Sequence, residues 1–231
     1  MSAVNHTRSD AAIPADAPVD ASAGTPAPGR ATPYELLLLV PALIAANCWM
    51  FTSVSPGDLT YLPSRVLNGE WWRLFTHPFV HVSWYHLLLD GGAVVTTYIC
   101  LSEPRMIKRV LYFLLSAVGT TLVAHVGSPL TEQIGLCGMS GVAYGLVAVC
   151  GLEMMGEDRL RGRSMVLGLL CLGVVTACAM VEAITGKGFY SYMDCGLLGQ
   201  PIAIAHAGGV LGGIVAYAAM NRPRSTTRVS A

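Results

Sequence analysis

The chain has 231 residues, of which 53% are hydrophobic and 12% are charged, and its formal net charge is zero. A soluble domain carries about 25% charged residues, so the composition excludes an ordinary soluble domain and indicates a protein that crosses a membrane several times. The lack of net positive charge argues against nucleic acid as a partner. The seven cysteines form no CxxC pair, so a metal or redox centre has little support.

The predicted elements begin after a polar tail. Residues 1–33 are rich in Ala, Pro, Asp, Ser and Thr, which predicts a disordered segment and not a signal peptide. Six apolar segments follow, close to the roughly 20 residues that span a bilayer. They predict an all-α membrane domain of six transmembrane helices over 34–221 and a short basic tail at 222–231. The predicted helices cover 34–54, 80–101, 107–126, 139–155, 164–185 and 201–220.

The distribution of basic residues predicts the orientation of this bundle. If the N-terminus is cytoplasmic, eleven of the 14 Lys and Arg residues lie on the cytoplasmic side. The positive-inside rule therefore favours cytoplasmic N- and C-termini. The second, fourth and sixth helices then start on the outer side, with Pro201 in the first turn of the sixth. Ser140 opens the fourth helix and His206 lies about 7–8 Å below Pro201, so polar groups of three helices gather at one depth.

Ser140 and His206 are the first candidate pair. A serine hydroxyl needs an adjacent base to act as a nucleophile, and a histidine suits that task. Glycines four residues apart on both helices would let their backbones approach closely. Tyr144 lies one turn after Ser140, where its ring could stack on the imidazole. No acid adjoins His206 in the sequence, so a Ser-His dyad is expected and not a triad. The alternative is that both are satisfied polar residues of a helix bundle.

The second helix carries a further polar pair. His86 and Asp90 are four residues apart on one face, and ionisable groups inside a membrane are functional candidates. Their position suits stabilisation of an oxyanion near Ser140; the alternative is a structural hydrogen-bonded pair. His77 and His81 form an HxxxH pattern without a glutamate base, which is a weak zinc signal. Structural hydrogen bonds are the favoured interpretation for these two histidines.

Three other features have structural interpretations. Glu182, near the outer end of the fifth helix, is assigned an ion pair with Lys187, with a substrate contact as the alternative. Cys137 and Cys195 would lie near one membrane face, where a disulfide between them is possible but is not the favoured interpretation. His125 is expected to mark the outer interface of the third helix.

Three linked motifs carry a family resemblance. The segment GEWWRLFTHPFVHVSWYHLLLD, the GMSG that begins at Gly138 and the HAGGVLGG that begins at His206 together resemble the rhomboid intramembrane serine proteases. The resemblance covers about residues 34–221. It implies cleavage of transmembrane or juxtamembrane segments of membrane proteins, with no cofactor and no metal. Ser140 would be the nucleophile and His206 the general base.

The resemblance also implies supporting roles. The Ser140 amide and His86 would form the oxyanion hole, Tyr144 would be the aromatic partner of the histidine, and His81 would brace the first outer loop. Asp90 is a departure, because the family commonly has asparagine there. A carboxylate would repel an oxyanion unless it were protonated. We hypothesise that Asp90 instead turns away and orients His86.

A finer resemblance concerns the substrate. The compact core and the stretch VEAITGKG before the sixth helix are similar to the rhombosortase branch, which implies processing of C-terminal glycine-rich sorting anchors. The implied partners are a substrate helix and the lipid bilayer, and the implied location is a bacterial inner membrane. Two alternatives remain: an inactive rhomboid-like protein that binds membrane helices, and a small transporter or channel with the histidines as a proton path. The transporter or channel alternative does not explain the serine and glycine motifs.

Overall fold

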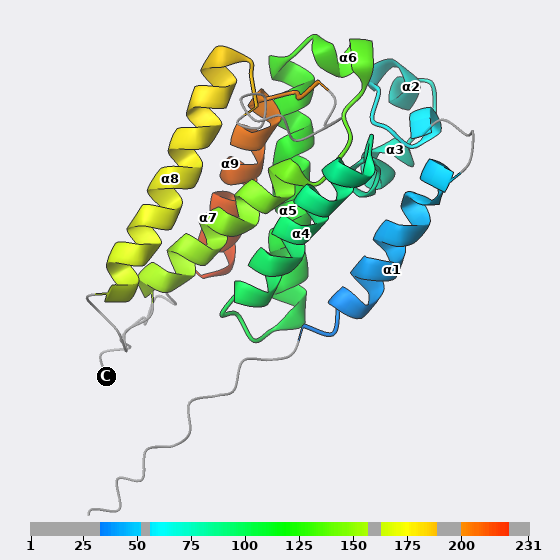
Figure 1. The fold of residues 1–231 in the computed structure, drawn as a ribbon. Helices are drawn as coiled ribbons and strands as arrows, with labels where there is room; N and C mark the ends of the chain where they lie inside the picture. Colours follow the sequence, from blue (N-terminus) through cyan, green and yellow to red (C-terminus); the bar gives the residue numbers. More distant parts are fainter. Residues whose placement is uncertain (1–32, 52–55, 157–162, 189–199, 222–231) are drawn as a thin grey trace, which may run out of the picture.

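The protein is described here by a computed structural model covering residues 33–51, 56–156, 163–188 and 200–221, and every regular element in these ranges is helical. In Figure 1, α8 forms one flank of a bundle and α1 the opposite flank, with the other long helices between them. Cys195 and nearly all of the two predicted tails lie outside the described residues. The principal helices are α1 (Leu36–Ala46), α4 (Trp84–Cys100), α5 (Met106–Gly127), α7 (Ser140–Gly156), α8 (Arg163–Thr185) and α9 (Ile204–Met220).

Every boundary of the six principal helices but one lies within four residues of the predicted boundary. The first helix ends at Ala46 and is followed by a 3₁₀ turn, η1 (Cys48–Phe51), although the apolar run predicted a helix to residue 54. Asn47 ends the helix because its side-chain amide donates to the carbonyl oxygens of Leu43 and Phe79, both at 2.7 Å. The last helix begins at Ile204, so the prediction that Pro201 lies in its first turn is wrong.

The connection between α1 and α4 is folded into short helices. They are η2 (Pro56–Asp58), α2 (Pro63–Leu67), α3 (Arg73–Thr76) and η3 (His77–Phe79). The buried Arg73 side chain holds them together: its Nε donates to Glu70 at 2.7 Å and its Nη1 to the Thr60 carbonyl at 2.8 Å. Reciprocal backbone hydrogen bonds of 2.9 Å between Tyr61 and Leu136 join this connection to the segment before α7. The short helix α6 (Leu130–Ile134) lies at the same end of the bundle (Figure 1).

Glycine faces bring α9 close to two neighbours. A methyl group at Gly209 would collide with the carbonyl oxygen of Gly141 in α7, and one at Gly208 with the carbonyl oxygen of Gly119 in α5. Gly212 and Gly213 repeat these contacts one turn later. Backbones that touch in this way require residues without a Cβ atom. The helix α9 therefore packs closely against both α5 and α7.

The outer surface of the bundle is apolar. Within the described residues, two helices are long and apolar enough to cross a membrane by themselves: Met106–Gly127 with a mean hydropathy of 1.7 and Ser164–Thr185 with 2.3. Large side chains of α8 such as Leu170, Val181 and Ile184 are more than half exposed. Exposure of such an apolar surface to water is unfavourable, whereas its contact with lipid is favourable. The count of six spans and the cytoplasmic termini stay predictions.

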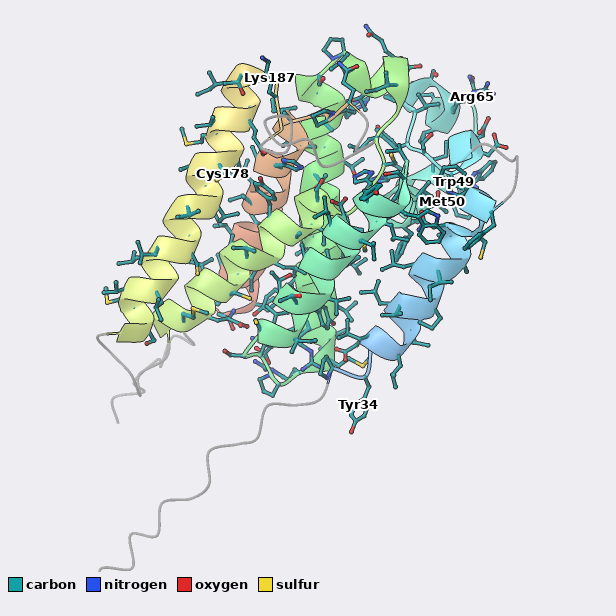
Figure 2. The ribbon with its side chains drawn as sticks, in the orientation of Figure 1. Tyr34, Trp49, Met50, Arg65, Cys178 and Lys187 are labelled. Carbon is teal, nitrogen blue, oxygen red and sulfur yellow. The ribbon has the colours of Figure 1, made fainter. Side chains whose placement is uncertain are left out.

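A charged cluster lies at the end of the bundle opposite the short helices. Arg109 of α5 donates to both carboxylate oxygens of Glu35 at 3.0 Å, and the Tyr98 hydroxyl of α4 donates to the same carboxylate at 3.0 Å. Figure 2 labels the neighbouring Tyr34 at this end, with Arg65 and Lys187 at the other end. The polar groups are thus concentrated at the two ends of the bundle and in one cluster at the start of α7.

Candidate active site

Ser140 and His206 meet between α7 and α9. Ser140 is the first residue of α7 and His206 lies in the first turn of α9. The Ser140 Oγ and the His206 Nε2 are 2.8 Å apart, within hydrogen-bond distance. The contact of Gly209 with Gly141 lies within a turn of both residues. Close packing of the two backbones therefore brings these side chains together.

Tyr144 covers one face of the imidazole. Its ring is stacked on that of His206, with centroids 4.3 Å apart and an interplanar angle of 15°. Tyr144 follows Ser140 by one helical turn, so the same face of α7 presents both side chains to His206. The stacking limits rotation of the imidazole plane.

Glu182 of α8 completes the surroundings of His206. Its Oε2 lies 2.5 Å from the His206 Nδ1, and its Oε1 accepts a hydrogen bond of 3.1 Å from the Tyr144 hydroxyl. From the sequence we expected this carboxylate to pair with Lys187 and no acid to lie at His206. Both expectations are corrected by these contacts. A signal was present: Glu182 is the sole acidic or basic residue in the apolar run 164–185, and such residues are rarely without a role.

These contacts favour one tautomer of the imidazole. An ionised carboxylate can only accept, which favours the tautomer in which the His206 Nδ1 carries the proton and donates to Glu182. The His206 Nε2 is then unprotonated and accepts from the Ser140 hydroxyl. The side chain of His206 is 7% exposed and that of Glu182 is 3% exposed, so both are largely shielded from water. The arrangement can withdraw a proton from Ser140.

Asp90 of α4 lies at the start of α7. Its Oδ2 accepts hydrogen bonds from the backbone amides of Met139 and Ser140, both at 2.9 Å, and lies 3.1 Å from the His86 Nε2. The pairing of Asp90 with His86 agrees with the hypothesis from their spacing. The hypothesis that Asp90 turns away is wrong, because the positive N-terminal end of α7 attracts the carboxylate. Its oxygen occupies the point on which all three donors converge.

Gly138 makes this approach sterically feasible. Its φ is +94°, in the left-handed region that favours glycine. A Cβ atom there would lie 2.8 Å from the Asp90 Oδ2 and from the His86 Nε2. Gly138 therefore both turns the chain into α7 and leaves room for the side chains of α4.

The other histidines in the described part of the chain have structural surroundings. The His77 Nε2 lies 2.9 Å from the Thr121 Oγ1 of α5, and the His125 Nδ1 lies 3.0 Å from the Tyr61 hydroxyl. His81 is fully buried, with its ring 5.0 Å from that of His86 and its backbone amide bonded to the Asn47 Oδ1 at 2.9 Å. In the described part of the chain, no three His, Cys, Asp or Glu residues are grouped as metal ligands.

Cys137 is a second nucleophile close to Ser140 in the sequence. Burial, reinforced by the charge of Asp90, raises the pKa of its thiol to about 12. The reactive form of cysteine is the thiolate, so Cys137 stays protonated at neutral pH. Ser140 is therefore the better candidate nucleophile at this point of the fold.

Comparison with known proteins agrees with this architecture. The Rhomboid domain model matches residues 68–223, more than half of the chain. A protein of Bacillus subtilis (strain 168), named "Putative rhomboid protease YdcA", is 30% identical over 154 residues, covering 62% of this chain and 75% of that protein. No solved structure matches the chain significantly. The chain belongs to the rhomboid family, which confirms the resemblance drawn from its motifs, and like that family it is a membrane protein.

Proposed function

We propose that this protein is an intramembrane serine endopeptidase that cleaves transmembrane or juxtamembrane segments of membrane proteins. The observation that carries the proposal is the 2.8 Å contact between the Ser140 Oγ and the His206 Nε2. A hydroxyl and an unprotonated imidazole nitrogen at this distance are a nucleophile and its base. Membership of the rhomboid family supports the same chemistry.

In this mechanism Ser140 and His206 exchange one proton. The Ser140 Oγ attacks the scissile carbonyl carbon while the His206 Nε2 takes the hydroxyl proton. His206 then gives that proton to the leaving amine, and the C–N bond breaks to leave an acyl group on Ser140. Water attacks this acyl group with the same imidazole as base. The new peptide carboxylate leaves and Ser140 regains its proton. No metal or cofactor takes part.

The developing oxyanion needs donors beside Ser140. The backbone amides of Met139 and Ser140 and the His86 Nε2 are the candidates, because all three already converge on one oxygen, that of Asp90. Such preorganised donors stabilise charge that develops in the transition state. Gly138, Tyr144 and His81 support the site through the turn before α7, the stacking on His206 and the packing on His86.

The membrane arrangement completes the proposal. Residues 34–221 form the membrane domain, with α1, α4, α5, α7, α8 and α9 as six spans and both termini in the cytoplasm of a bacterial cell. The substrate is a helix that enters from the bilayer. The stretch before α9 favours the rhombosortase branch, whose substrates are C-terminal glycine-rich sorting anchors.

One observation favours a second candidate function. The Asp90 carboxylate uses the donors that an oxyanion requires, as would be expected of an inactive rhomboid-like protein that only binds membrane helices. The intact contact between Ser140 and His206 argues for the protease. A measurement of serine reactivity separates the two.

The test is labelling of the detergent-solubilised protein with a fluorophosphonate, which reacts with activated serines. We expect wild type to be labelled and the Ser140→Ala and His206→Ala variants to remain unlabelled. Circular dichroism and thermal unfolding would establish that all three proteins are folded. A folded wild type that takes up no label would refute the protease and favour the helix-binding alternative.

A further inference from the structure

We infer that Glu182 is the third member of a Ser140–His206–Glu182 relay, acting as a positioning residue for His206. This inference rests on the proposed function and extends it, because a Ser-His dyad would leave the His206 Nδ1 to a neutral partner. The carrying observation is the 2.5 Å distance between the His206 Nδ1 and the Glu182 Oε2, with the Ser140 Oγ 2.8 Å from the opposite ring nitrogen. The three groups form one continuous line of hydrogen bonds across α7, α9 and α8.

The burial of Glu182 makes a merely incidental contact hard to explain. The side chain is 3% exposed, in a helix whose Leu170, Val181 and Ile184 side chains are more than half exposed. An ionised carboxylate in such surroundings is costly unless its oxygens accept hydrogen bonds. Each Glu182 oxygen has such a partner: Oε2 has His206 and Oε1 has the Tyr144 hydroxyl. Both partners belong to the candidate active site.

Tyr144 contributes both to the stacking on His206 and to the position of the Glu182 carboxylate. Its ring stacks on the imidazole and its hydroxyl donates to the Glu182 carboxylate. The carboxylate is thus aligned with the edge of the imidazole while the tyrosine ring covers its face. The imidazole has one orientation in which Nδ1 meets Glu182 and Nε2 meets Ser140.

The chemical role follows from the tautomer. A neutral imidazole has one protonated nitrogen, and a carboxylate at Nδ1 keeps the proton there, so that Nε2 can accept from Ser140. When His206 takes the serine proton, it becomes a cation beside the negative charge of Glu182. A glutamine could instead donate to Nδ1 and favour the tautomer that cannot act as base. Loss of the charge at unchanged size should therefore reduce the reaction rate.

The test compares Glu182→Gln and Glu182→Asp with wild type. We expect Glu182→Gln to slow the fluorophosphonate reaction of Ser140 by up to about 10⁴-fold, the loss seen when the acid of a serine triad is neutralised, and Glu182→Asp to retain part of the rate. The matched control is Glu153→Gln, which neutralises a buried carboxylate near the other end of α7, where it accepts from the amides of Ser102 and Glu103. This control should react within about twofold of wild type.

A spectroscopic readout separates positioning from a structural role. A histidine Nδ1 proton donated to a carboxylate gives a strongly downfield proton NMR signal, which we expect in wild type and in Ser140→Ala but not in Glu182→Gln. The relay would be overturned if Glu182→Gln reacted with the fluorophosphonate at the wild-type rate. It would also be overturned if wild type lacked the downfield proton signal. A wild type that shows the signal but takes up no label would refute the protease and leave the hydrogen bond standing.

A second inference rests on a different contact: we propose that Asp90 fills the oxyanion hole of the resting protein and must leave it before Ser140 can react. Its Oδ2 accepts from Met139 N, Ser140 N and the His86 Nε2 at 2.9, 2.9 and 3.1 Å. A single oxygen that accepts from three N–H groups resembles the oxyanion of a tetrahedral intermediate. The side chain is 6% exposed, so it is largely shielded from water.

Hydrogen bonds and the end of α7 hold the carboxylate in place. The histidines that face it are His86 on its own helix and His81 on the preceding segment, the latter with its Nε2 3.7 Å from the Asp90 Oδ2. The N-terminus of α7 contributes its partial positive charge. A substrate carbonyl carries less charge than a carboxylate, so it cannot compete for the donors until Asp90 moves.

Asp90→Asn tests this occupancy, because an amide has the same shape without the charge and can also donate to an oxyanion. We expect the variant to react with the fluorophosphonate at least about tenfold faster than wild type, since one donor of an oxyanion hole changes rates by about 10²–10³-fold. Glu153→Gln again serves as the charge control and should not accelerate the reaction.

The opposite outcome would follow if Asp90 only orients His86. An equal or slower reaction of a folded Asp90→Asn protein would overturn the occupancy. If that variant does not fold, Asp90→Ala decides the question, because it removes the competing oxygen altogether. A faster reaction of Asp90→Ala supports the occupancy and a slower one refutes it. Wild type gives the reference rate. If the proposed function is wrong, folded wild type takes up no label, and this outcome differs from a failure of the occupancy alone.

Discussion

His77 shows at the scale of one residue how a polar side chain is accommodated inside the bundle. It lies in the connection that precedes α4, is 1% exposed, and its Nε2 donates to the Thr121 Oγ1 because the threonine hydroxyl donates to the Ala117 carbonyl. Its Nδ1 has no hydrogen-bond partner among the described residues. A second proton on this ring would therefore be buried without an acceptor. Burial lowers the pKa of His77 to about 3.

The pH dependence of stability follows from this shift. The unfolded chain has a histidine pKa of about 6.5, so neutral His77 contributes its full stability above that pH and loses it as the pH falls toward 3. We expect His77 to lower the free energy of unfolding by at most about 2 kcal/mol between pH 7 and pH 5. Burial lowers the pKa of His81 to about 4, which adds a loss of the same sign.

The measurement is the unfolding midpoint of wild type and of His77→Gln at both pH values. The glutamine amide can still donate to Thr121 and does not titrate, so the variant should lose less stability on acidification. His81 accounts for the part that remains. Equal losses in the two proteins would contradict the assignment to His77.

At the scale of an element, α9 decides whether the site forms. Most of its buried residues are glycines or alanines. Gly208 and Gly212 pack against α5, and Gly209 and Gly213 pack against α7. These contacts fix the position of His206, which lies one turn before Gly209 in α9. A displacement of α9 of a few tenths of an ångström would lengthen the contact with Ser140.

Gly209→Ala should therefore affect both stability and reactivity. The new methyl group would collide with the Gly141 carbonyl oxygen, and such overpacking costs about 1–3 kcal/mol. The matched control is Gly173→Ala in α8, because a Cβ atom there meets nothing within 4 Å; its stability should rise by at most about 1 kcal/mol. Thermal unfolding and fluorophosphonate labelling check both variants. Normal labelling and stability of Gly209→Ala would show that α9 can shift without loss.

At the scale of the whole molecule, the polar groups of the candidate site lie between helices, and His206, Glu182 and Asp90 are buried. Apolar side chains of α5 and α8 cover the exterior, and Arg109 with Glu35 stabilises the end opposite the short helices. The candidate site draws its polar groups from α4, α7, α8 and α9, so it exists only when the bundle is assembled. Unfolding of any of these helices should abolish the reaction of Ser140.

Hydrophobicity and small-residue spacing made much of this predictable from the sequence. Apolar runs identified the six principal helices because the bilayer requires long apolar segments. Glycines four residues apart predicted the close approach of α7 and α9, and hence the meeting of Ser140 and His206. The motifs predicted the rhomboid family, which the comparisons confirm. These features can be read along the chain, from the apolar runs, the glycine spacing and the three linked motifs.

The tertiary structure alone decided which acids meet these residues. An apolar helix such as α8 gives no periodic signal of its rotation, so the sequence did not reveal that Glu182 faces His206 and not Lys187. The placement of Asp90 on the amides of Met139 and Ser140 likewise depends on how α4 packs against the start of α7. The sequence determined where the helices and motifs lie, because hydrophobic burial acts along the chain. Only helix packing determined the relay and the filled oxyanion hole, because hydrogen bonds between helices depend on their rotation and depth.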